Sequence, residues 1–264
     1  MADAERLIPA ATILLVRDEP DLQVLMVERH HQIDFASGAL VFPGGKTQAE
    51  DSADGWADAV DGAVDPAARA FMIAAVREGF EESAILLARR RDARGPGRPL
   101  ASAADCAALH PLRDAIARGE ASFLTAVRDA GLVLALDALT PFAHWITPKG
   151  MPKRFDTHFY LAVTPEDQEE ACDGGEAVDA VWIAPHDALA QAKSGARTII
   201  FPTRMNVEML AKAATSSEAL AQAKARTIVT VEPQIVREDG AMMLIIPAEA
   251  GYSVTREPLE GNRP

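Results

Sequence analysis

The sequence predicts an α/β fold in which helices pack on a mixed β-sheet. Strand-like apolar segments and alanine-rich helical segments follow one another irregularly along the 264 residues. Several strand segments are joined by short turns, as in antiparallel hairpins. This irregular order indicates a sheet with both parallel and antiparallel strands. We expect one domain over residues 7–264, with a helical insertion at about residues 95–132.

The composition excludes several classes of protein. The formal net charge is −13, so the basic surface that phosphate contacts require in a nucleic-acid binder is not expected. The same charge disfavours an anionic membrane surface, and no apolar run approaches the 18 residues of a membrane span. Cys106 and Cys172 lack metal-ligand spacing and are expected to be reduced thiols of a cytoplasmic protein.

The first elements are predicted to form a hairpin followed by a tight turn. Residues 10–17 and 22–29 are both β-prone, and the Asp/Pro turn at residues 18–21 joins them. The apolar run at residues 40–42 then ends in Pro43-Gly44-Gly45. Glycines at this point permit positive φ angles and a close approach of the backbone to other groups.

A helix is predicted over residues 66–87, because Asp65 is a good N-cap and proline suits the first helical position. Glu78, Glu81 and Glu82 stand at i, i+3 and i+4 on it and share one face. Their mutual repulsion would be relieved by a divalent cation, and oxygen-only ligands suit Mg²⁺ or Mn²⁺ better than Zn²⁺. The alternative is an acidic face that simply contacts water.

Three further predictions concern the segments that flank this helix, one before it and two after it. Residues 52–62 are expected to form an acidic loop with one helical turn. Residues 89–99 form a basic Gly/Pro-rich segment, expected to be a mobile linker, although its charge could also attract a polyphosphate. Residues 101–117 and 121–130 are alanine-rich and predict a helical hairpin beside the core.

A basic loop precedes the strand predicted at residues 155–163. Lys149, Lys153 and Arg154 surround a Gly/Pro turn, where they could grip phosphates or balance the acidic protein. Arg154 is the preferred phosphate ligand, since arginine forms bidentate contacts with phosphate. A strand is predicted at residues 180–185, and helices at residues 186–190, 205–213 and 216–225, with Thr203 as the N-cap of the second helix. Residues 228–236 and 242–246 predict a closing hairpin. The tail from about Ser253 is expected to fray.

Two of these segments together resemble a known motif. Phe42-Pro43-Gly44-Gly45 and Arg77-Glu78-x-x-Glu81-Glu82, with apolar Ile85, resemble the Nudix box of the Nudix hydrolases. The first half of the box fits either Gly45 with Asp51 or Gly44 with Glu50. Gly45 and Arg77 are 32 positions apart (77 − 45), far more than in the family pattern, so an insertion interrupts the box. The interrupted box and the segments at residues 141–148 and 154–157 together resemble those of the Nudix 19-type acyl-CoA diphosphatase subfamily.

The chain departs from the family pattern at two positions. Gly79 stands where the family has an apolar residue, and glycine inside a helix costs about 1 kcal/mol relative to alanine. Ala84 replaces the glycine that ends the helix in the family. Because alanine resists the left-handed conformation of a C-cap, we expect the helix to continue to about Arg90.

The resemblance implies a Nudix-type α/β/α sandwich over roughly residues 7–191, and metal-dependent hydrolysis of a nucleoside diphosphate linked to another moiety. It favours CoA or acyl-CoA as substrate, cut to adenosine 3′,5′-bisphosphate and a 4′-phosphopantetheine product, with Mg²⁺ or Mn²⁺ as cofactor. ADP-ribose, NADH and a non-catalytic ligand sensor are the alternatives. The expected partner is thus a small-molecule nucleoside diphosphate, with no nucleic acid and no membrane; a homodimer is left open.

The resemblance also implies roles for individual residues. The expected metal ligands are three side chains and one backbone carbonyl: Glu78, Glu81, Glu82 and Gly45. The expected catalytic residues are Glu78, Arg77, Glu82 and Glu176. Among them, Glu78 or Glu176 accepts the proton of the attacking water, and Arg77 orients a carboxylate. Arg29 and Arg154 are the candidate substrate-binding residues.

Overall fold

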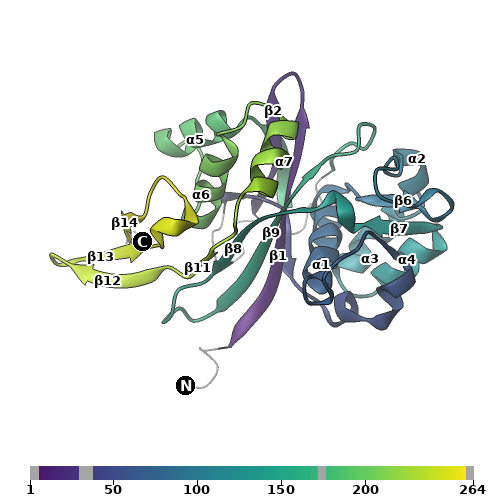
Figure 1. Ribbon diagram of the computed structural model, residues 1–264, viewed down its shortest axis with the longest axis horizontal. Coiled ribbons are helices and arrows are strands. Elements are labelled where there is room, and N and C mark those ends of the chain that lie inside the picture. The colour runs from purple at the N-terminus through teal and green to yellow at the C-terminus, as the bar shows by residue number, and fades with distance from the viewer. Residues whose placement is uncertain (1–5, 30–37, 172–176, 260–264) are drawn as a thin grey trace.

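A mixed sheet forms the centre of the protein (Figure 1), whose computed structural model describes residues 6–29, 38–171 and 177–259. The order of the main strands is β10-β2-β1-β9-β8-β11, with β3 beside β2 and β4 beside β1. β1 runs parallel to β9, whereas β2 and β8 pair with these strands in the antiparallel direction. The mixed sheet is therefore confirmed. Its strands are β1 (Leu7–Asp18), β2 (Leu22–Arg29), β3 (Leu40–Val41), β4 (Gly44–Lys46), β8 (Thr140–Ile146), β9 (Arg154–Val163), β10 (Ala177–Ile183) and β11 (Thr230–Val231).

Helices cover both faces of this sheet, as Figure 1 shows. One face packs against α1 (Pro66–Ser83), and the other against α5 (Pro185–Ser194), α6 (Phe201–Leu210) and α7 (Ser216–Ala225). Because side chains alternate along a strand, β1 contributes to both apolar cores. Ile13 and Leu15 lie in the core on the α1 side, and Leu14 and Val16 in the other. The α/β/α sandwich is confirmed.

A second, small sheet lies beside α1 in the order β5-β7-β6. Its strands are β5 (Val60–Asp61), β6 (Ala88–Arg90) and β7 (Leu132–Ala135). Short helices accompany it: α2 (Ala103–Cys106), α3 (Arg113–Ala117) and α4 (Phe123–Asp129). The expected long helical hairpin is thus wrong in detail, because Ser102 and Ser122 cap separate short helices and Pro111 interrupts the first run.

The acidic loop expected at residues 52–62 is instead part of this small sheet. The one helical turn expected there is present as a 3₁₀ turn at Asp54–Asp58, which follows another at Ala49–Ser52 and precedes β5. Trp56 is fully buried and packs against Phe123, with 5.6 Å between the ring centroids. The burial of this one tryptophan in the core beside α1 orders a segment whose composition alone indicates a loop.

The basic segment at residues 89–99 is not a mobile linker. Arg89 is buried and donates two hydrogen bonds to Asp137, at 2.5 and 3.0 Å, and one to Asp61 at 3.2 Å. Arg91 and Arg94 donate to the backbone oxygen of Asp58, each at 3.2 Å. Local acidic groups therefore neutralise the basic residues and hold the segment against β5 and β7.

Helix α1 begins at Pro66 as predicted, with Asp65 accepting a hydrogen bond from the Ala67 amide at 2.9 Å. The expected continuation toward Arg90 is wrong, because Ala84 adopts a left-handed conformation (φ 64°) and ends the helix. The next three residues are buried, and the Leu86 amide donates to Gln168 at 2.8 Å. This burial and hydrogen bonding offset the cost of a left-handed alanine, which is about 1–2 kcal/mol.

The C-terminal strands form a separate three-stranded sheet: β12 (Gln234–Glu238), β13 (Ala241–Ile245) and β14 (Arg256–Pro258). The predicted hairpin is confirmed from Gln234 onward, with Asp239 and Gly240 as its two-residue turn at φ angles of 48° and 86°. The start of its first predicted strand is wrong, because Thr230–Val231 form β11, which pairs with β8 in the central sheet. The expected fraying from Ser253 is wrong for β14, which pairs with β13. Thr203 is not an N-cap, because Pro202 allows α6 to begin earlier, at Phe201.

Two other expectations concern cysteines and membrane spans. Cys106 is a free, buried cysteine, and burial raises the pKa of its thiol to about 12. Cys172 lies outside the described residues. Among the helices of the described segments, none combines the length and the apolar character needed to cross a membrane.

Candidate active site

Three glutamates of α1 lie together at one end of a cleft of about 1030 Å³. Glu78, Glu81 and Glu82 are only 8, 6 and 7% exposed, although each lines this cleft. They do not form a solvated acidic face. Ionised carboxylates are buried only where cations or hydrogen-bond donors compensate them, so their burial calls for positive partners.

Arg77 supplies one such partner from the same helix. Its Nη1 donates to Glu78 at 2.9 Å and to Glu81 at 3.0 and 3.2 Å. Its Nε and Nη2 form a bidentate pair with Asp51 at 3.1 and 3.0 Å, and Nη2 also donates to the Lys46 carbonyl at 2.8 Å. The contact expected between Arg77 and a carboxylate of the box is therefore present.

These partners keep the guanidinium of Arg77 protonated and positively charged. Burial alone would lower the pKa of the guanidinium, but its hydrogen bonds to Asp51 and the charges of Glu78, Asp51 and Glu81 raise the pKa above its ordinary value. Removing one member of such a buried pair typically costs about 3–5 kcal/mol, because the remaining charge is left in the interior. Arg77 thus connects α1, β4 and the turn that contains Asp51.

The position of Asp51 decides between the two alignments of the first half of the box. Asp51 is buried against Arg77, whereas Glu50 points to the insertion. Glu50 accepts hydrogen bonds from the Ser122 hydroxyl at 2.5 Å and the Phe123 amide at 2.9 Å, at the start of α4. The pairing of Gly45 with Asp51 is therefore the one that the structure supports.

The two glycines of β4 allow the backbone to touch these carboxylates. A Cβ atom on Gly45 would lie 2.6 Å from both carboxylate oxygens of Glu78. The Gly44 amide donates to Glu82 at 3.2 Å, and a Cβ there would lie 2.6 Å from the Ala11 carbonyl. Any larger residue would push the backbone and the carboxylates apart.

Gly79, which departs from the family pattern, has a packing reason. A Cβ atom at this position would lie 3.2 Å from Cγ2 of Ile13 on β1, which is tighter than ordinary contact. The glycine therefore lets α1 lie close to the sheet directly beside Glu78. A glycine inside a helix costs about 1 kcal/mol relative to alanine, and the close packing of α1 on β1 offsets this cost.

The oxygen donors of this cluster fit a hard divalent cation. One guanidinium, from Arg77, pairs with the three carboxylates of Asp51, Glu78 and Glu81, and Glu82 lines the same cleft. All three glutamates line the cleft, where water and substrate phosphates can reach them. An open set of carboxylates suits Mg²⁺ or Mn²⁺, which keep waters and also bind substrate phosphates.

Beyond the carboxylates, the walls of the cleft are mostly apolar. They come from β8, β9, the start of α6 and the C-terminal hairpin of β12 and β13. The apolar side chains that line the cleft include Trp145, Ile146, Met151, Phe155, Phe159, Phe201, Ile235, Leu244 and Leu259. The site thus joins a charged end to a long apolar surface.

Arg154, the expected phosphate ligand, does not line this cleft. It is buried, donates to the Thr147 carbonyl at 3.0 Å and forms an ion pair with Glu232 at 2.5 Å. The structure therefore gives no support to a phosphate contact by Arg154, since its guanidinium is paired with Glu232, a residue distant in sequence. The phosphate role of Arg154 stays a prediction. The side chain of Arg29 and the whole of Glu176 lie outside the described residues.

Two cationic residues that line the cleft were not predicted as ligands: Lys46 and Arg118. Lys46 follows the Gly-Gly turn directly, and this adjacency is a signal that sequence reasoning could have used. Arg118 comes from the insertion and pairs with Glu120 at 2.9 Å. No local pattern of the sequence places it near the box, because the path of the insertion brings it there.

The chain is similar to known proteins in sequence. Residues 58–209, which are 152 of the 264 (209 − 58 + 1), match the family described as NUDT19 Nudix domain. "Acyl-coenzyme A diphosphatase NUDT19" of Gallus gallus is 28% identical, over 70% of this chain and 63% of that protein. The protein of the same name from Homo sapiens is 27% identical, over 90% of this chain and 74% of that protein. The chain thus spans less than two thirds of the chicken relative.

A solved structure is similar as well. The crystal structure of a NUDIX hydrolase from Alicyclobacillus acidocaldarius superposes with a TM-score of 0.65 and 28% identity. The match covers 82% of this chain and 96% of that chain, so most of the architecture described above is shared.

Proposed function

This chain belongs to the Nudix hydrolases, in the group described as the NUDT19 Nudix domain, and from this premise we propose that it hydrolyses the diphosphate of CoA or acyl-CoA. The products are adenosine 3′,5′-bisphosphate and 4′-phosphopantetheine or its acyl derivative. The observation that carries the proposal is a cleft with three buried glutamates at one end and a long apolar surface beyond them. Such a cleft suits a substrate with a charged diphosphate and an extended, weakly polar arm.

Mg²⁺ or Mn²⁺ is the proposed cofactor, and when bound it neutralises the diphosphate and lowers the pKa of a bound water. Glu78, Glu81 and Glu82 are the proposed side-chain ligands, because they are the buried oxygen donors of the cleft. The Gly45 carbonyl is the proposed fourth ligand, since the lack of a Cβ keeps the backbone against Glu78. We retain Glu176 as a second proposed base, although it lies outside the described residues.

Arg77 and Asp51 act through the carboxylates. Arg77 holds Glu78 and Glu81 by hydrogen bonds from one nitrogen, while Asp51 holds the other side of its guanidinium. This arrangement keeps Glu78 in a single orientation, from which it accepts the proton of the attacking water. Removing a residue that orients a metal ligand in this way typically lowers activity or metal affinity 10–100-fold.

The apolar walls support CoA derivatives over smaller substrates. ADP-ribose has no apolar arm that could cover Trp145, Phe201 and Leu244. The pantetheine arm and acyl chain of an acyl-CoA are long enough to cover these side chains and remove them from water. The relatives named acyl-coenzyme A diphosphatase support the same substrate class. Lys46 is the proposed phosphate contact in place of Arg154, because it lines the cleft beside the glutamates; Arg29 stays a candidate.

We also propose that residues 7–264 form one domain. The insertion shares an apolar core with the sheet, since Trp56 and Phe123 belong to the same cluster as Ile13 and Phe80. The C-terminal hairpin contributes Ile235 and Leu244 to the cleft. Removing either part would therefore expose core or cleft surface.

The test is product formation from a panel of acyl-CoA, CoA, NADH, ADP-ribose and deoxynucleoside triphosphates with Mg²⁺ or Mn²⁺. We expect metal-dependent turnover of CoA species that Glu82→Gln abolishes and that Glu249→Gln, an exposed glutamate outside the cleft, leaves intact. Turnover of ADP-ribose or NADH alone would keep the catalytic site and overturn the substrate. Absence of any metal-dependent turnover would favour the non-catalytic ligand sensor.

A further inference from the structure

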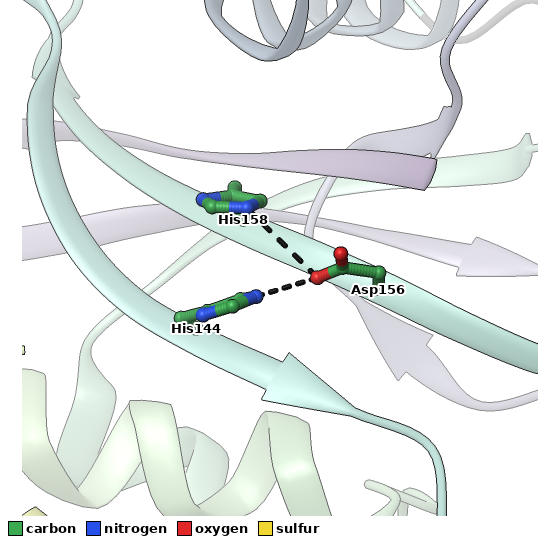
Figure 2. A group of neighbouring side chains, drawn as sticks. All are labelled: His144, Asp156 and His158. Atoms are coloured by element: carbon green, nitrogen blue, oxygen red, sulfur yellow. Dashed lines mark hydrogen bonds and ion pairs between the residues drawn. The ribbon is translucent and has the colours of Figure 1, made fainter. Parts of the chain in front are cut away.

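Two histidines and an aspartate meet on the sheet, outside the cleft described above (Figure 2). Asp156 and His158 are two positions apart on β9 and therefore face the same side of the sheet. His144 on β8 is the direct cross-strand partner of His158. Figure 2 shows both rings turned toward the same oxygen of Asp156: Nε2 of His144 is 2.5 Å from Oδ1, and Nε2 of His158 is 3.9 Å from it.

We propose that His144, Asp156 and His158 bind a divalent transition metal, with Zn²⁺ as the simplest case. One ligand atom from each of the three lies within 4.8 Å of the others, which no other such group in the described segments achieves. A four-coordinate Zn²⁺ with ordinary bond lengths keeps its ligand atoms about 3.3 Å apart. The two measured separations, 2.5 and 3.9 Å, lie on either side of that value, so small side-chain rotations suffice.

Neighbouring groups already orient the proposed ligands. The Nδ1 atom of His144 is 2.7 Å from the Thr230 hydroxyl on β11, which is the kind of contact that fixes the other ring nitrogen as a metal ligand. The two imidazole rings are stacked, with centroids 4.1 Å apart. On its other side, His158 packs against Phe71 of α1, with 4.2 Å between the centroids. Contacts from β11 and α1, together with the stacking of the two rings, therefore restrict their orientation.

The donor atoms distinguish this site from the glutamate cluster. Two imidazoles and one carboxylate suit Zn²⁺, Co²⁺, Ni²⁺ or Fe²⁺, whereas Mg²⁺ prefers oxygen alone. The side chains of His144, Asp156 and His158 are 19, 27 and 32% exposed, so an ion can enter from solvent. Three protein ligands leave a further position for water.

The proposed site is distant from the glutamates along α1. Phe71, which packs on His158, precedes Glu78 by seven residues, or about 10 Å of helix axis. An ion bound there would link β8 and β9, and through Thr230 also β11, rather than contact the diphosphate. This inference does not depend on the proposed function, and it predicts a stabilising metal that the reaction does not use.

Co²⁺ titration tests the site, because tetrahedral nitrogen-ligated Co²⁺ absorbs visible light far more strongly than octahedral oxygen-ligated Co²⁺. The titration uses the full chain in excess Mg²⁺, which occupies oxygen-only sites. We expect one equivalent of Co²⁺ per chain to give the strong absorption, and Zn²⁺ to abolish it by displacement. Zn²⁺ should also raise the melting temperature of the wild-type protein.

Five variants make this result specific. His144→Gln, His158→Gln and Asp156→Asn should each lose the absorption and the melting-temperature shift, with circular dichroism confirming that they are folded. His186→Gln, an exposed histidine of α5 outside the cluster, should keep both. Glu82→Gln should keep them as well. A wild-type protein without the absorption, or folded cluster variants that retain it, would overturn the proposal.

Discussion

At the scale of single residues, the charge balance of the candidate active site depends on Arg77. A single guanidinium contacts Asp51, Glu78 and Glu81: its Nη1 donates to both glutamates, and its Nε and Nη2 donate to Asp51. Lysine carries the same charge but only one nitrogen, so it cannot maintain this geometry.

We therefore expect Arg77→Lys to lower kcat about 10–100-fold, because Glu78 loses its fixed orientation. Steady-state kinetics on acyl-CoA, with Mg²⁺ concentration varied, would show both a lower kcat and a higher Mg²⁺ requirement. Arg113→Lys, outside the cleft, serves as the matched control. Wild-type kinetics in Arg77→Lys would mean that the contacts in the structure have no catalytic role.

The second prediction at this scale concerns Gly45. Alanine there would place a methyl group 2.6 Å from both carboxylate oxygens of Glu78, so either the β4 backbone or the carboxylate must move. We expect Gly45→Ala to remove most of the activity and weaken Mg²⁺ binding, measured by calorimetric titration. Gly55→Ala is the control, since its methyl would meet only the flexible end of Leu124. Equal effects of both substitutions would contradict this account.

The predictability of the site also differs from residue to residue. The spacing of Glu78, Glu81 and Glu82 is local, so the sequence was sufficient to place them on one helical face. The partner of Arg154 could not be predicted, because Glu232 is 78 positions away in sequence and meets it only in the fold. The cluster of His144, Asp156 and His158 was missed, although Asp-x-His on a strand is a readable signal.

At the scale of elements, the end of α1 shows tertiary structure overriding a local preference. Ala84 is left-handed although alanine disfavours this conformation, and the reason is the burial of residues 85–87 and the contact of Leu86 with Gln168. Alanine does disfavour the left-handed conformation locally, but the contacts that compensate for it come from Gln168, which is distant in sequence.

Ala84→Gly should consequently stabilise the protein. Glycine removes a strain of about 1–2 kcal/mol, partly offset by the greater freedom of the unfolded chain. We expect the melting temperature to rise by about 2–4 °C for each net kcal/mol. Ala190→Gly, at an exposed position inside α5, should lower it, because glycine is unfavourable in a right-handed helix. A fall in both variants would show that Ala84 is unstrained.

The C-terminal hairpin is the element that we expect to recognise the acyl chain. Leu244 on β13 lines the cleft, and burying one such side chain contributes about 1.5–3 kcal/mol. Leu244→Ser should therefore raise KM for a long-chain acyl-CoA about 10-fold or more, with little change for free CoA. Val236→Ser, on the paired strand but outside the cleft, is the control. Equal changes for both substrates would place the acyl chain elsewhere.

At the scale of the whole molecule, the sandwich could be predicted and the insertion could not. The central sheet could be predicted because short turns join consecutive strands such as β1 and β2, so the signals for each hairpin lie close together in the sequence. The small sheet joins β5, β7 and β6 from distant segments, and its stability depends on the burial of Trp56 and the pairing of Arg89 with Asp137. Such long-range contacts leave no periodic pattern in the sequence.

The arrangement of these parts forms the proposed catalytic centre. α1 supplies the carboxylates, β4 brings its glycines against them, and the C-terminal hairpin adds apolar side chains to the lining of the cleft. The central claim is that this combination cuts the diphosphate of a CoA derivative with the help of metal ions.

Mass spectrometry of the products from acyl-CoA tests this claim most directly. With Mg²⁺ or Mn²⁺ present, the account predicts adenosine 3′,5′-bisphosphate and acyl-4′-phosphopantetheine in equal amounts, and neither product from Glu82→Gln or with a chelator. Cleavage of the thioester alone, or equal product formation by folded Glu82→Gln, would contradict it.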